Sequence, residues 1–495
     1  MARNKPLFFL VVLSCFALSS CNLHRKTGGG GGGGGGNATV SFTLAAVPLK
    51  ATAPGGSPST SVLSFAVTLS SIQLTPTSGS AVTVPLNTAT YVVDLTRLQS
   101  DSALGEVLAS VPADTYNKIT VGVTTAVVTY CTDLGGTLGC DSGSVKQVAQ
   151  TAASTPSTSS FSATLASGQK TAIQIQFNFA NAITISSTQP QVVSAVNLGA
   201  NVLTASTLAP TSTTSSLGTG QLDFIEDVTG TVTAASASSV TVKTSTCGSI
   251  TAALNSSTVL IPNCVTTGAA CTPAVGQFAS VDTVLNSDGT FTALEYDPIA
   301  PTSSDWIEGI VTSVPSSSTQ FQIVTNDISL ASSSSLIGAN LSLGDPMQVT
   351  LSNVNPFLVD SKGLPVVATP FTNNTDASVI VPGQTVALHV NAFTAKSGSV
   401  LAAIAADTVA LRFTRVTGSI SNVASTFFNL QSLPPFFGPA TSYEAQVSSG
   451  SPSTNYDGVP NATSLTVGGT AAVRALYFGS QFTPAFSAAK VRAFF

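Results

Sequence analysis

The sequence contains very little charge. Only 8% of its 495 residues are Asp, Glu, Lys or Arg, against about 25% in typical soluble proteins. Arg3, Lys5, Arg25 and Lys26 all precede a run of nine glycines, so the chain from residue 27 onward keeps 13 basic and 22 acidic residues, a net charge of −9. No basic run follows the glycines. Nucleic acid is therefore excluded as an expected partner, because its binding needs a concentrated positive surface.

Histidine is also scarce, which limits the chemistry open to the chain. His24 and His389 are the only two. A Ser-His-Asp arrangement requires a histidine, and zinc sites commonly use several. His389 alternates with apolar residues, which predicts a structural position facing solvent. We predict a protein that is not an enzyme, with no catalytic residue, no metal and no cofactor.

Long apolar runs are missing as well. Residues 7–18 form a short apolar stretch after a basic start, whereas a membrane-spanning helix needs about 20 apolar residues. The stretch is typical of a secretory signal peptide, and it ends in Leu18-Ser19-Ser20-Cys21. These four residues resemble a bacterial lipobox. The resemblance implies a signal peptide over residues 1–21, with Cys21 as the first mature residue and the site of lipidation.

The residues after Cys21 predict a flexible tether to a membrane. Residues 22–37 include the nine glycines of 28–36, and such a run behaves as flexible coil. In lipoproteins of two-membrane bacteria an Asp after the lipidated cysteine resembles an inner-membrane retention signal, and Asn22 stands there instead. We therefore expect an exported protein, anchored to the outer membrane by the lipid and facing the periplasm or the cell surface.

Five cysteines remain after the lipidation site, and the expected compartment is oxidising, which favours disulfides. Cys131 and Cys140 flank a glycine-rich stretch and are predicted to close a hairpin loop. Cys264 and Cys271 are candidates for a second short loop that leaves Cys247 free, and pairing of Cys247 with Cys264 is the alternative.

Alternating apolar and polar residues dominate the first part of the body. Residues 39–44, 118–130 and 171–179 read as strands, and residues 98–109 are expected to hold a short helix. Strand signals at this spacing predict an antiparallel β-sandwich over residues 38–200.

Five short runs stand out in this region: Val40-Ser41-Phe42-Thr43-Leu44, Ile72-Gln73-Leu74-Thr75-Pro76, Val93-Asp94-Leu95-Thr96-Arg97-Leu98-Gln99, Val111-Pro112-Ala113-Asp114-Thr115-Tyr116-Asn117-Lys118-Ile119 and Ala166-Ser167-Gly168-Gln169-Lys170-Thr171. These runs resemble the DUF4382 domain family, a family of unknown function found in bacterial lipoproteins. The first run is followed by Ala45-Ala46-Val47-Pro48, where the family often has Thr-Asp-Ala-Pro, so this chain lacks the acidic residue at that position.

After a Ser/Thr-rich linker over residues 201–222, three degenerate repeats follow. Each repeat opens with a strand centred on glycine, continues to a glycine turn that enters another strand, and ends with an alternating strand. The opening glycines are Gly230, Gly309 and Gly418, and the turn glycines are Gly276, Gly383 and Gly468.

The repeats resemble tandem DUF5666 domains, which are small β-barrels of unknown function. We assign residues 223–300, 301–412 and 413–495 to the three repeats. The predicted fold is therefore all-β, with an N-terminal antiparallel β-sandwich followed by three small β-barrel-like repeat domains.

Six of the seven acidic residues of the first repeat lie near its start or near a predicted hairpin. The group at its start is expected to solvate the linker junction, and Asp288 with Gly289 predicts a hairpin turn. A recognised calcium-binding loop is missing from the sequence. The six acids are Asp223, Glu226, Asp227, Asp282, Asp288 and Asp297.

The best candidate for ligand contact is the aromatic loop of residues 433–439. Phe436 and Phe437 are able to stack on sugar faces if exposed, although burial as the cap of a small barrel is the favoured alternative; Trp306 is expected in the core. We predict a non-catalytic binding or adhesion module for glycans or envelope components. The alternatives are a structural spacer of the envelope and a polysaccharide hydrolase.

Overall fold

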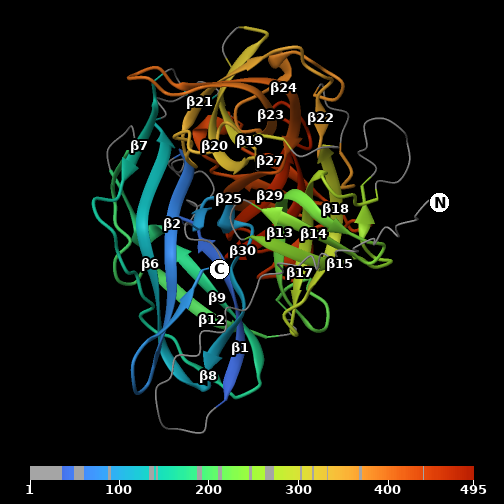
Figure 1. Cartoon of the computed structure of the whole chain (residues 1–495). Helices are drawn as coiled ribbons and strands as arrows, with labels where there is room; N and C mark the ends of the chain where they lie inside the picture. Colours follow the sequence, from blue (N-terminus) through green and yellow to red (C-terminus); the bar gives the residue numbers. More distant parts are fainter. Residues whose placement is uncertain are drawn as a thin grey trace, which may run out of the picture.

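The structure, a computed structural model, is almost entirely β and contains four units (Figure 1), which confirms the predicted fold class. One N-terminal domain is followed by barrel 1 (residues 221–300), barrel 2 (306–412) and barrel 3 (414–494). The described residues are 36–49, 61–86, 91–132, 139–140, 143–186, 192–209, 214–244, 248–261, 272–300, 304–314, 317–331, 333–366, 371–438 and 440–494.

The N-terminal domain consists of two main sheets that pack face to face. One sheet has the order β12-β9-β1-β5, with β1 and β9 parallel, and the other has the order β3-β2-β6-β7, with β4 paired to β2 and β8 to β6. A small hairpin of β10 and β11 follows α1. The elements are β1 (Asn37–Val47), β2 (Ser61–Pro76), β3 (Val82–Pro85), β4 (Tyr91–Asp94), η1 (Arg97–Gln99), β5 (Ala103–Pro112), β6 (Asp114–Cys131), β7 (Val145–Ala149), β8 (Ala163–Leu165), β9 (Lys170–Asn178), α1 (Phe179–Ala182), β10 (Ile183–Ile185), β11 (Val193–Val196) and β12 (Leu203–Leu208).

The core of this domain lies between the two sheets and follows from the alternation in the sequence. Phe42 and Ile173 come from one sheet, while Phe65 comes from the other, and all three are fully buried. The ring of Phe65 meets the ring of Phe179 edge to face, with centroids 5.2 Å apart. Each strand therefore buries one face, as the period of two predicts.

Two local expectations for this region are wrong. Residues 98–109 do not form a helix: only the single 3-10 turn η1 is present, and β5 then pairs with β1, which satisfies its backbone groups across the sheet. Residues 203–208, assigned from the sequence to the linker, form β12 and complete the sheet beside β9.

The three barrels share one topology. In barrel 1 the strand order is β15-β14-β13-β17-β18-β16, and a parallel pairing of β15 with β18 closes the sheet; barrels 2 and 3 repeat this order and closure. Their strands are β13 (Gln221–Ala235), β14 (Ser239–Thr244), β15 (Ser249–Ala253), β16 (Val259–Leu260), β17 (Phe278–Asn286), β18 (Phe291–Ala300), β19 (Trp306–Ser313), β20 (Gln320–Ser329), β21 (Pro346–Leu351), β22 (Leu358–Val359), β23 (Thr385–Thr394), β24 (Ala402–Arg412), β25 (Thr414–Val423), β26 (Phe427–Gln431), β27 (Tyr443–Val447), β28 (Asn455–Asp457), β29 (Thr470–Tyr477) and β30 (Phe486–Phe494).

The opening glycines of the repeats lie where the first two strands of each barrel come close. A β-carbon at Gly309 would lie 2.8 Å from the carbonyl oxygen of Val324, and one at Gly418 would lie 2.9 Å from that of Gln431. At Gly230 it would meet the backbone of the neighbouring strand in the same way. Only glycine permits this approach, which explains why the repeat opens on it.

The turn glycines are equivalent in conformation and in hydrogen bonding. Gly276, Gly383 and Gly468 have φ angles of +92°, +93° and +85°, which glycine adopts without strain. The N–H of Gly276 donates to the carbonyl oxygen of Val232, and Gly383 donates likewise to Val311, each at 2.9 Å. Each acceptor lies two residues after the opening glycine, and Gly468 follows the same rule with Ile420 at 2.8 Å. The three barrels are therefore copies of one structural unit.

Candidate functional site

All five arginines that follow the glycine run converge on the junction of the four units. Arg97 comes from η1, Arg412 from the end of β24, Arg415 from β25, Arg474 from β29 and Arg492 from β30. Their side chains are between 1% and 13% exposed. The sequence suggests a surface poor in charge, and the structure shows where the charge lies instead: most of it is buried in one cluster, which we call the junction cluster.

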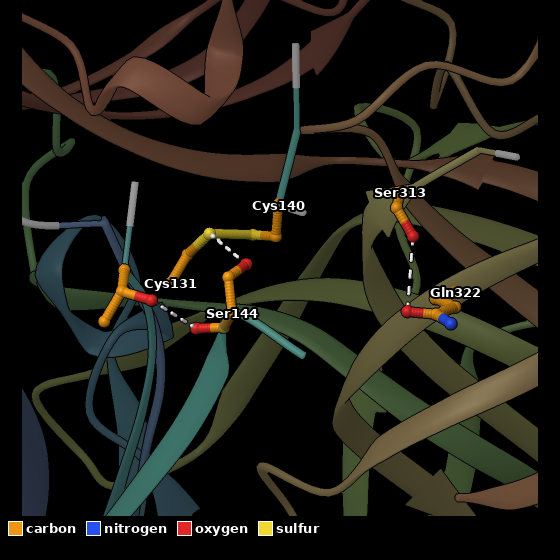
Figure 2. Close-up of a disulfide and its surroundings, with 6 residues drawn as sticks. Cys131, Cys140, Ser144, Ser313 and Gln322 are labelled. Atoms are coloured by element: carbon orange, nitrogen blue, oxygen red, sulfur yellow. Dashed lines mark hydrogen bonds between the residues drawn. A yellow bond between two sulfur atoms is a disulfide. The ribbon is translucent and has the colours of Figure 1, made fainter. Parts of the chain in front are cut away.

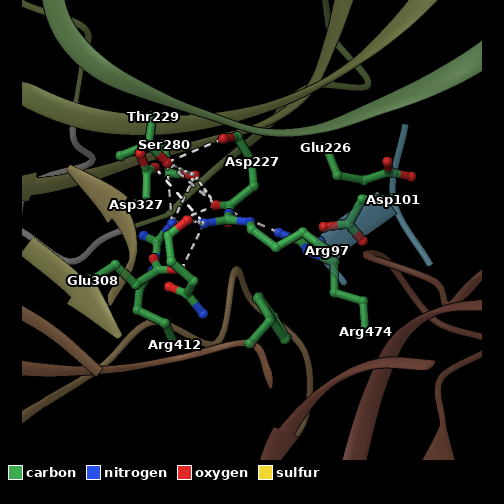
Figure 3. Close-up of polar contacts among 12 residues, drawn as sticks. Arg97, Asp101, Glu226, Asp227, Thr229, Ser280, Glu308, Asp327, Arg412 and Arg474 are labelled. Atoms are coloured by element: carbon green, nitrogen blue, oxygen red, sulfur yellow. Dashed lines mark hydrogen bonds and ion pairs between the residues drawn. The ribbon is translucent and has the colours of Figure 1, made fainter. Parts of the chain in front are cut away.

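Asp227 is the centre of the junction cluster (Figure 3). It lies at a bulge in β13, where the register with β17 shifts between Ile225 and Val228, and its φ angle is +58°. The bulge turns the carboxylate toward the junction, where five cations from the three other units lie within 4 Å. These are Arg97 at 2.6 Å, Arg415 at 2.9 Å, Lys362 and Arg474 at 3.7 Å each, and Arg412 in direct contact.

Asp282, on the neighbouring strand β17, supports the same arrangement. Its carboxylate accepts the backbone N–H of Asp227 at 2.6 Å. It also pairs with Lys362 at 2.7 Å and with Arg474 at 2.9 Å. Barrel 1 therefore supplies the anions to which barrels 2 and 3 bring their cations.

The pairing of barrels 1 and 3 uses equivalent positions of the two repeats. Asp227 and Arg415 each lie three residues before the opening glycine, and Asp282 and Arg474 each lie six residues after the turn glycine. Each acid of barrel 1 thus pairs with the arginine that occupies the same repeat position in barrel 3. This is the geometry of an isologous interface with an approximate two-fold relation.

Barrel 2 has uncharged or weakly basic residues at these two positions and contacts barrel 1 differently. Trp306 occupies the first position and stacks on Phe278 of barrel 1, with ring centroids 5.2 Å apart. His389 replaces the second; its Nδ1 lies 2.6 Å from Asp407, and its ring is tilted against Trp306 at 5.6 Å. Trp306 is buried, as predicted. His389 is half-buried and paired, so the expected solvent-facing position is only partly correct.

Barrel 2 and the N-terminal domain complete the junction cluster. Arg412 pairs with Glu308 of its own barrel at 3.2 Å and contacts Asp360. From η1 and the residues after it, Arg97 pairs with Glu308 at 2.9 Å, and Asp101 pairs with Arg415 at 2.7 Å. Every unit therefore contributes at least one charged side chain to the same network.

Burial and the surrounding cations move the pKa values of the acids in opposite directions. Burial alone would raise the pKa of Asp227, but Arg412 and Lys362 outweigh it and hold that pKa well below its usual value. Asp282 is lowered to a pKa of about 2, because Arg474 and Lys362 overcome its burial. Burial raises the pKa of Glu295 to about 8 and that of Asp327 to about 6. Some carboxyls in and near the cluster thus hold protons near neutrality.

These placements correct the expectation for the acids around the first repeat. Asp223, Glu226 and Asp227 do not solvate the linker junction; they are buried where the four units meet, because their cations lie far away in the sequence. Asp282 and Asp297 are buried too. At the predicted turn Gly289 has φ +80°, and the carboxylate of Asp288 accepts the N–H of Thr290 at 3.0 Å.

A groove of about 600 Å³ separates the N-terminal domain from barrel 2. Its floor is formed by Thr68 on β2, Val92 on β4 and Thr125 on β6, and its wall by the segment after β20, including Leu336 and Ile337. Asp327 is the one charged side chain among the described lining residues. The groove therefore offers hydroxyl, backbone and apolar contacts with almost no charge.

The aromatic loop of barrel 3 is buried. Phe436 and Phe437 are each 2% exposed, and Phe437 packs edge-on against Tyr477 with centroids 5.3 Å apart. The two rings also line a small, partly open pocket of about 80 Å³. Neither ring forms an exposed stacking surface. The loop is therefore buried as the cap of a small barrel, which was the favoured alternative from the sequence.

Cys131 and Cys140 are joined by a disulfide in the structure (Figure 2), with Cα atoms 5.9 Å apart. The end of this loop inserts between barrels 2 and 3. The N–H of Cys140 donates to the carbonyl oxygen of Thr312 at 2.7 Å, and the N–H of Gly139 donates to that of Phe436 at 3.1 Å. The disulfide thus holds a contact of the N-terminal domain with two barrels at once.

The other predicted cysteine sites, Cys21, Cys264 and Cys271, lie outside the described residues, as does Cys247. Within the described ranges, no group of three or more His, Cys, Asp and Glu residues is placed to hold a metal ion. Over the same ranges, no helix has the length and apolar character required to cross a membrane.

Comparison with known proteins identifies one part of the chain. Residues 52–193 match the family described as domain of unknown function DUF4382, so this part of the N-terminal domain is similar to that family. No curated protein matches the chain. Sequence analysis gave the acids of the junction cluster another role and missed its bases. The signal that could have found the cluster was the placement of acids in the first repeat and of bases at the equivalent positions of the third.

Proposed function

We propose that the chain is a non-catalytic lipoprotein of the cell envelope, exported and anchored to the outer membrane through a lipid on Cys21. Its body serves as a binding or adhesion module for glycans or other envelope components. The disulfide between Cys131 and Cys140 suits an oxidising compartment. In this proposal the three barrels are DUF5666-like repeats, a likeness supported by their common topology and equivalent glycines.

The observation that carries the binding proposal is the distribution of charge. Because the junction cluster is buried, the surface is left to hydroxyl, amide and apolar groups. Such a surface suits an uncharged partner better than a charged one. Among the described residues only seven charged side chains are exposed: Asp114, Lys118, Lys146, Lys170, Lys243, Asp288 and Lys396.

The groove beside barrel 2 is where we place ligand contact. Its volume falls in the range of small-molecule sites, and its floor carries the hydroxyls of Thr68 and Thr125, which lie 2.7 Å apart. Those hydroxyls retain donor or acceptor capacity for the hydroxyls of a sugar. This placement replaces the aromatic loop, whose rings are buried.

Binding is tested by presenting the purified, lipid-free body to a glycan array and to isolated envelope fractions. Thr125→Trp fills the groove and should abolish binding. Thr164→Trp is the matched control, because Thr164 is exposed on β8 of the same domain and does not line the groove. Absence of binding by the unchanged protein to every glycan and envelope fraction would refute the binding role.

A structural spacer is the second candidate, and the junction cluster favours it because it joins all four units. Protease treatment of intact cells, with mass spectrometry of the peptides and of the lipid on Cys21, tests the location. Release of barrel peptides places the body outside the cell and supports adhesion. Protection until lysis places it in the periplasm and favours the spacer.

A further inference from the structure

Lys490 is the least well satisfied cation of the junction. It lies on β30 with its side chain 0% exposed, and its ammonium contacts Oε1 of Glu226 on β13. Beyond this contact, neither Nζ nor that carboxylate oxygen has a hydrogen-bond partner. The ring of Phe224 lies nearby, with its centroid 5.2 Å from Nζ, and the charges of Asp101 and Asp223 also act on the lysine. An ammonium has three N–H donors, so burial with one contact is costly.

Lys362 provides an internal comparison. It is buried to the same degree, with its side chain 1% exposed, but it donates hydrogen bonds to Ser280 at 2.8 Å and to Asp282 at 2.7 Å. It also lies 3.7 Å from Asp227. Lys362 is therefore an ordinary buried ion-pair partner, and the incomplete surroundings of Lys490 require a different explanation.

The partner of Lys490 is also set up for reaction. The backbone N–H of Ser102 donates to Oε2 of Glu226 at 3.1 Å, while Oε1 is left to the lysine. Burial raises the pKa of Glu226 to about 7, against the effect of Lys490. Transfer of one proton from the ammonium to the carboxylate that it contacts converts the pair into an amine beside a carboxylic acid. The neutral amine is a nucleophile and the protonated carboxyl is its electrophile.

From the direct contact between these two buried groups, we propose that Nζ of Lys490 and Cδ of Glu226 condense to an amide that joins barrel 3 to barrel 1. The nitrogen lone pair attacks Cδ, a C–N bond forms and one C–O bond breaks. The carboxyl hydroxyl leaves with one amine proton as water, so the acid and the amine give one amide and one water. No oxidant or reductant takes part.

The geometry assists each stage of this condensation. Two strands hold the reacting groups in contact, which replaces a bimolecular encounter by a positioned one. The N–H of Ser102 stabilises the negative charge that develops on Oε2 during the attack. The product removes both charges and leaves a single N–H in place of three ammonium donors, which resolves the burial cost at Lys490.

The test is mass spectrometry of tryptic peptides from the full chain, after denaturation and reduction. The cross-link should join the peptide of residues 171–243 to that of residues 475–492, because trypsin no longer cleaves after Lys490. The joined pair should weigh one water less than the sum of the two. A folded wild-type protein that yields only separate peptides, cleaved after Lys490, overturns the proposal.

Two variants separate the amide from a simple ion pair. Lys490→Arg keeps the positive charge but has no nucleophilic amine, so it should give only unlinked peptides. Glu226→Gln should give the same linked product as the wild type, with ammonia instead of water as the leaving molecule. A linked species that persists in Lys490→Arg would place the bond elsewhere and also overturn the proposal.

Discussion

Replacing Asp227 by Asn removes the anion that the other three units share. Asparagine has nearly the same shape and tolerates the left-handed conformation that this position adopts at φ +58°. The substitution therefore tests the charge and leaves the backbone intact. It leaves Arg97, Arg412 and Arg415 with one carboxylate fewer in a buried site.

Breaking a buried ion pair by removing one partner costs about 3–5 kcal/mol. Asp227 has three cations within 3 Å and two more at 3.7 Å, so we expect the upper end, about 5 kcal/mol. Proteins unfold with about 5–15 kcal/mol in total, so the loss is large. Urea unfolding followed by the fluorescence of Trp306, the only tryptophan, measures it, because Trp306 lies between barrels 1 and 2.

The matched control is Asp288→Asn. Asp288 is exposed in the turn between β17 and β18, and asparagine before glycine suits such a turn, so this variant should change stability by less than about 0.5 kcal/mol. If Asp227→Asn costs less than about 1 kcal/mol, or no more than the control, the junction cluster does not hold the units together and the reasoning fails.

Three further results are expected. The melting temperature should be higher at about pH 5.5 than at about pH 8.5, and equal melting temperatures would contradict this. Burial raises the pKa of Glu295 from 4.5 to about 8 and that of Asp327 from 3.8 to about 6. The folded protein therefore holds protons on these carboxyls that are released on unfolding, so stability falls as pH rises. Cys140→Ser should lower the free energy of unfolding by about 3 kcal/mol, since it opens a short disulfide loop. Dithiol reductant should then destabilise the variant less than it destabilises the unchanged protein, because the bond between Cys131 and Cys140 is no longer there to be reduced. In urea unfolding, Gly383→Ala should cost about 1–3 kcal/mol more than Gly468→Ala. Both glycines have positive φ angles, but only a β-carbon at Gly383 would meet an aromatic ring, that of Phe437 at 2.7 Å. Similar losses in the two variants would argue against the contact between barrels 2 and 3.

The barrels were predictable because their signals are local. Gly230 allows a close approach of neighbouring strands, and Gly276 supplies a positive φ angle that other residues avoid. These backbone requirements repeat at the same places in all three units and are visible in the sequence. The alternation of residues 39–44 likewise predicted a strand with one buried face.

The junction cluster was not predictable in the same way. Asp227 meets Arg415 across a separation of 188 residues, and no local pattern states that two such positions touch. Charged side chains usually lie in water, so solvation was the natural expectation for Asp223 and Glu226. Only the comparison of equivalent repeat positions, with acids in one copy and bases in another, indicates that these residues pair.

The order of the charges along the chain also sets an order of assembly. Synthesis begins at the N-terminus, so the acids of barrel 1 exist before Arg415 and Arg474 of barrel 3. Until those strands arrive, Asp101 and Glu226 lack their ion-pair partners Arg415 and Lys490. A chain that stops before residue 414 would carry these two carboxylates unpaired at the junction, so incomplete copies are open to proteolysis where the finished molecule is closed.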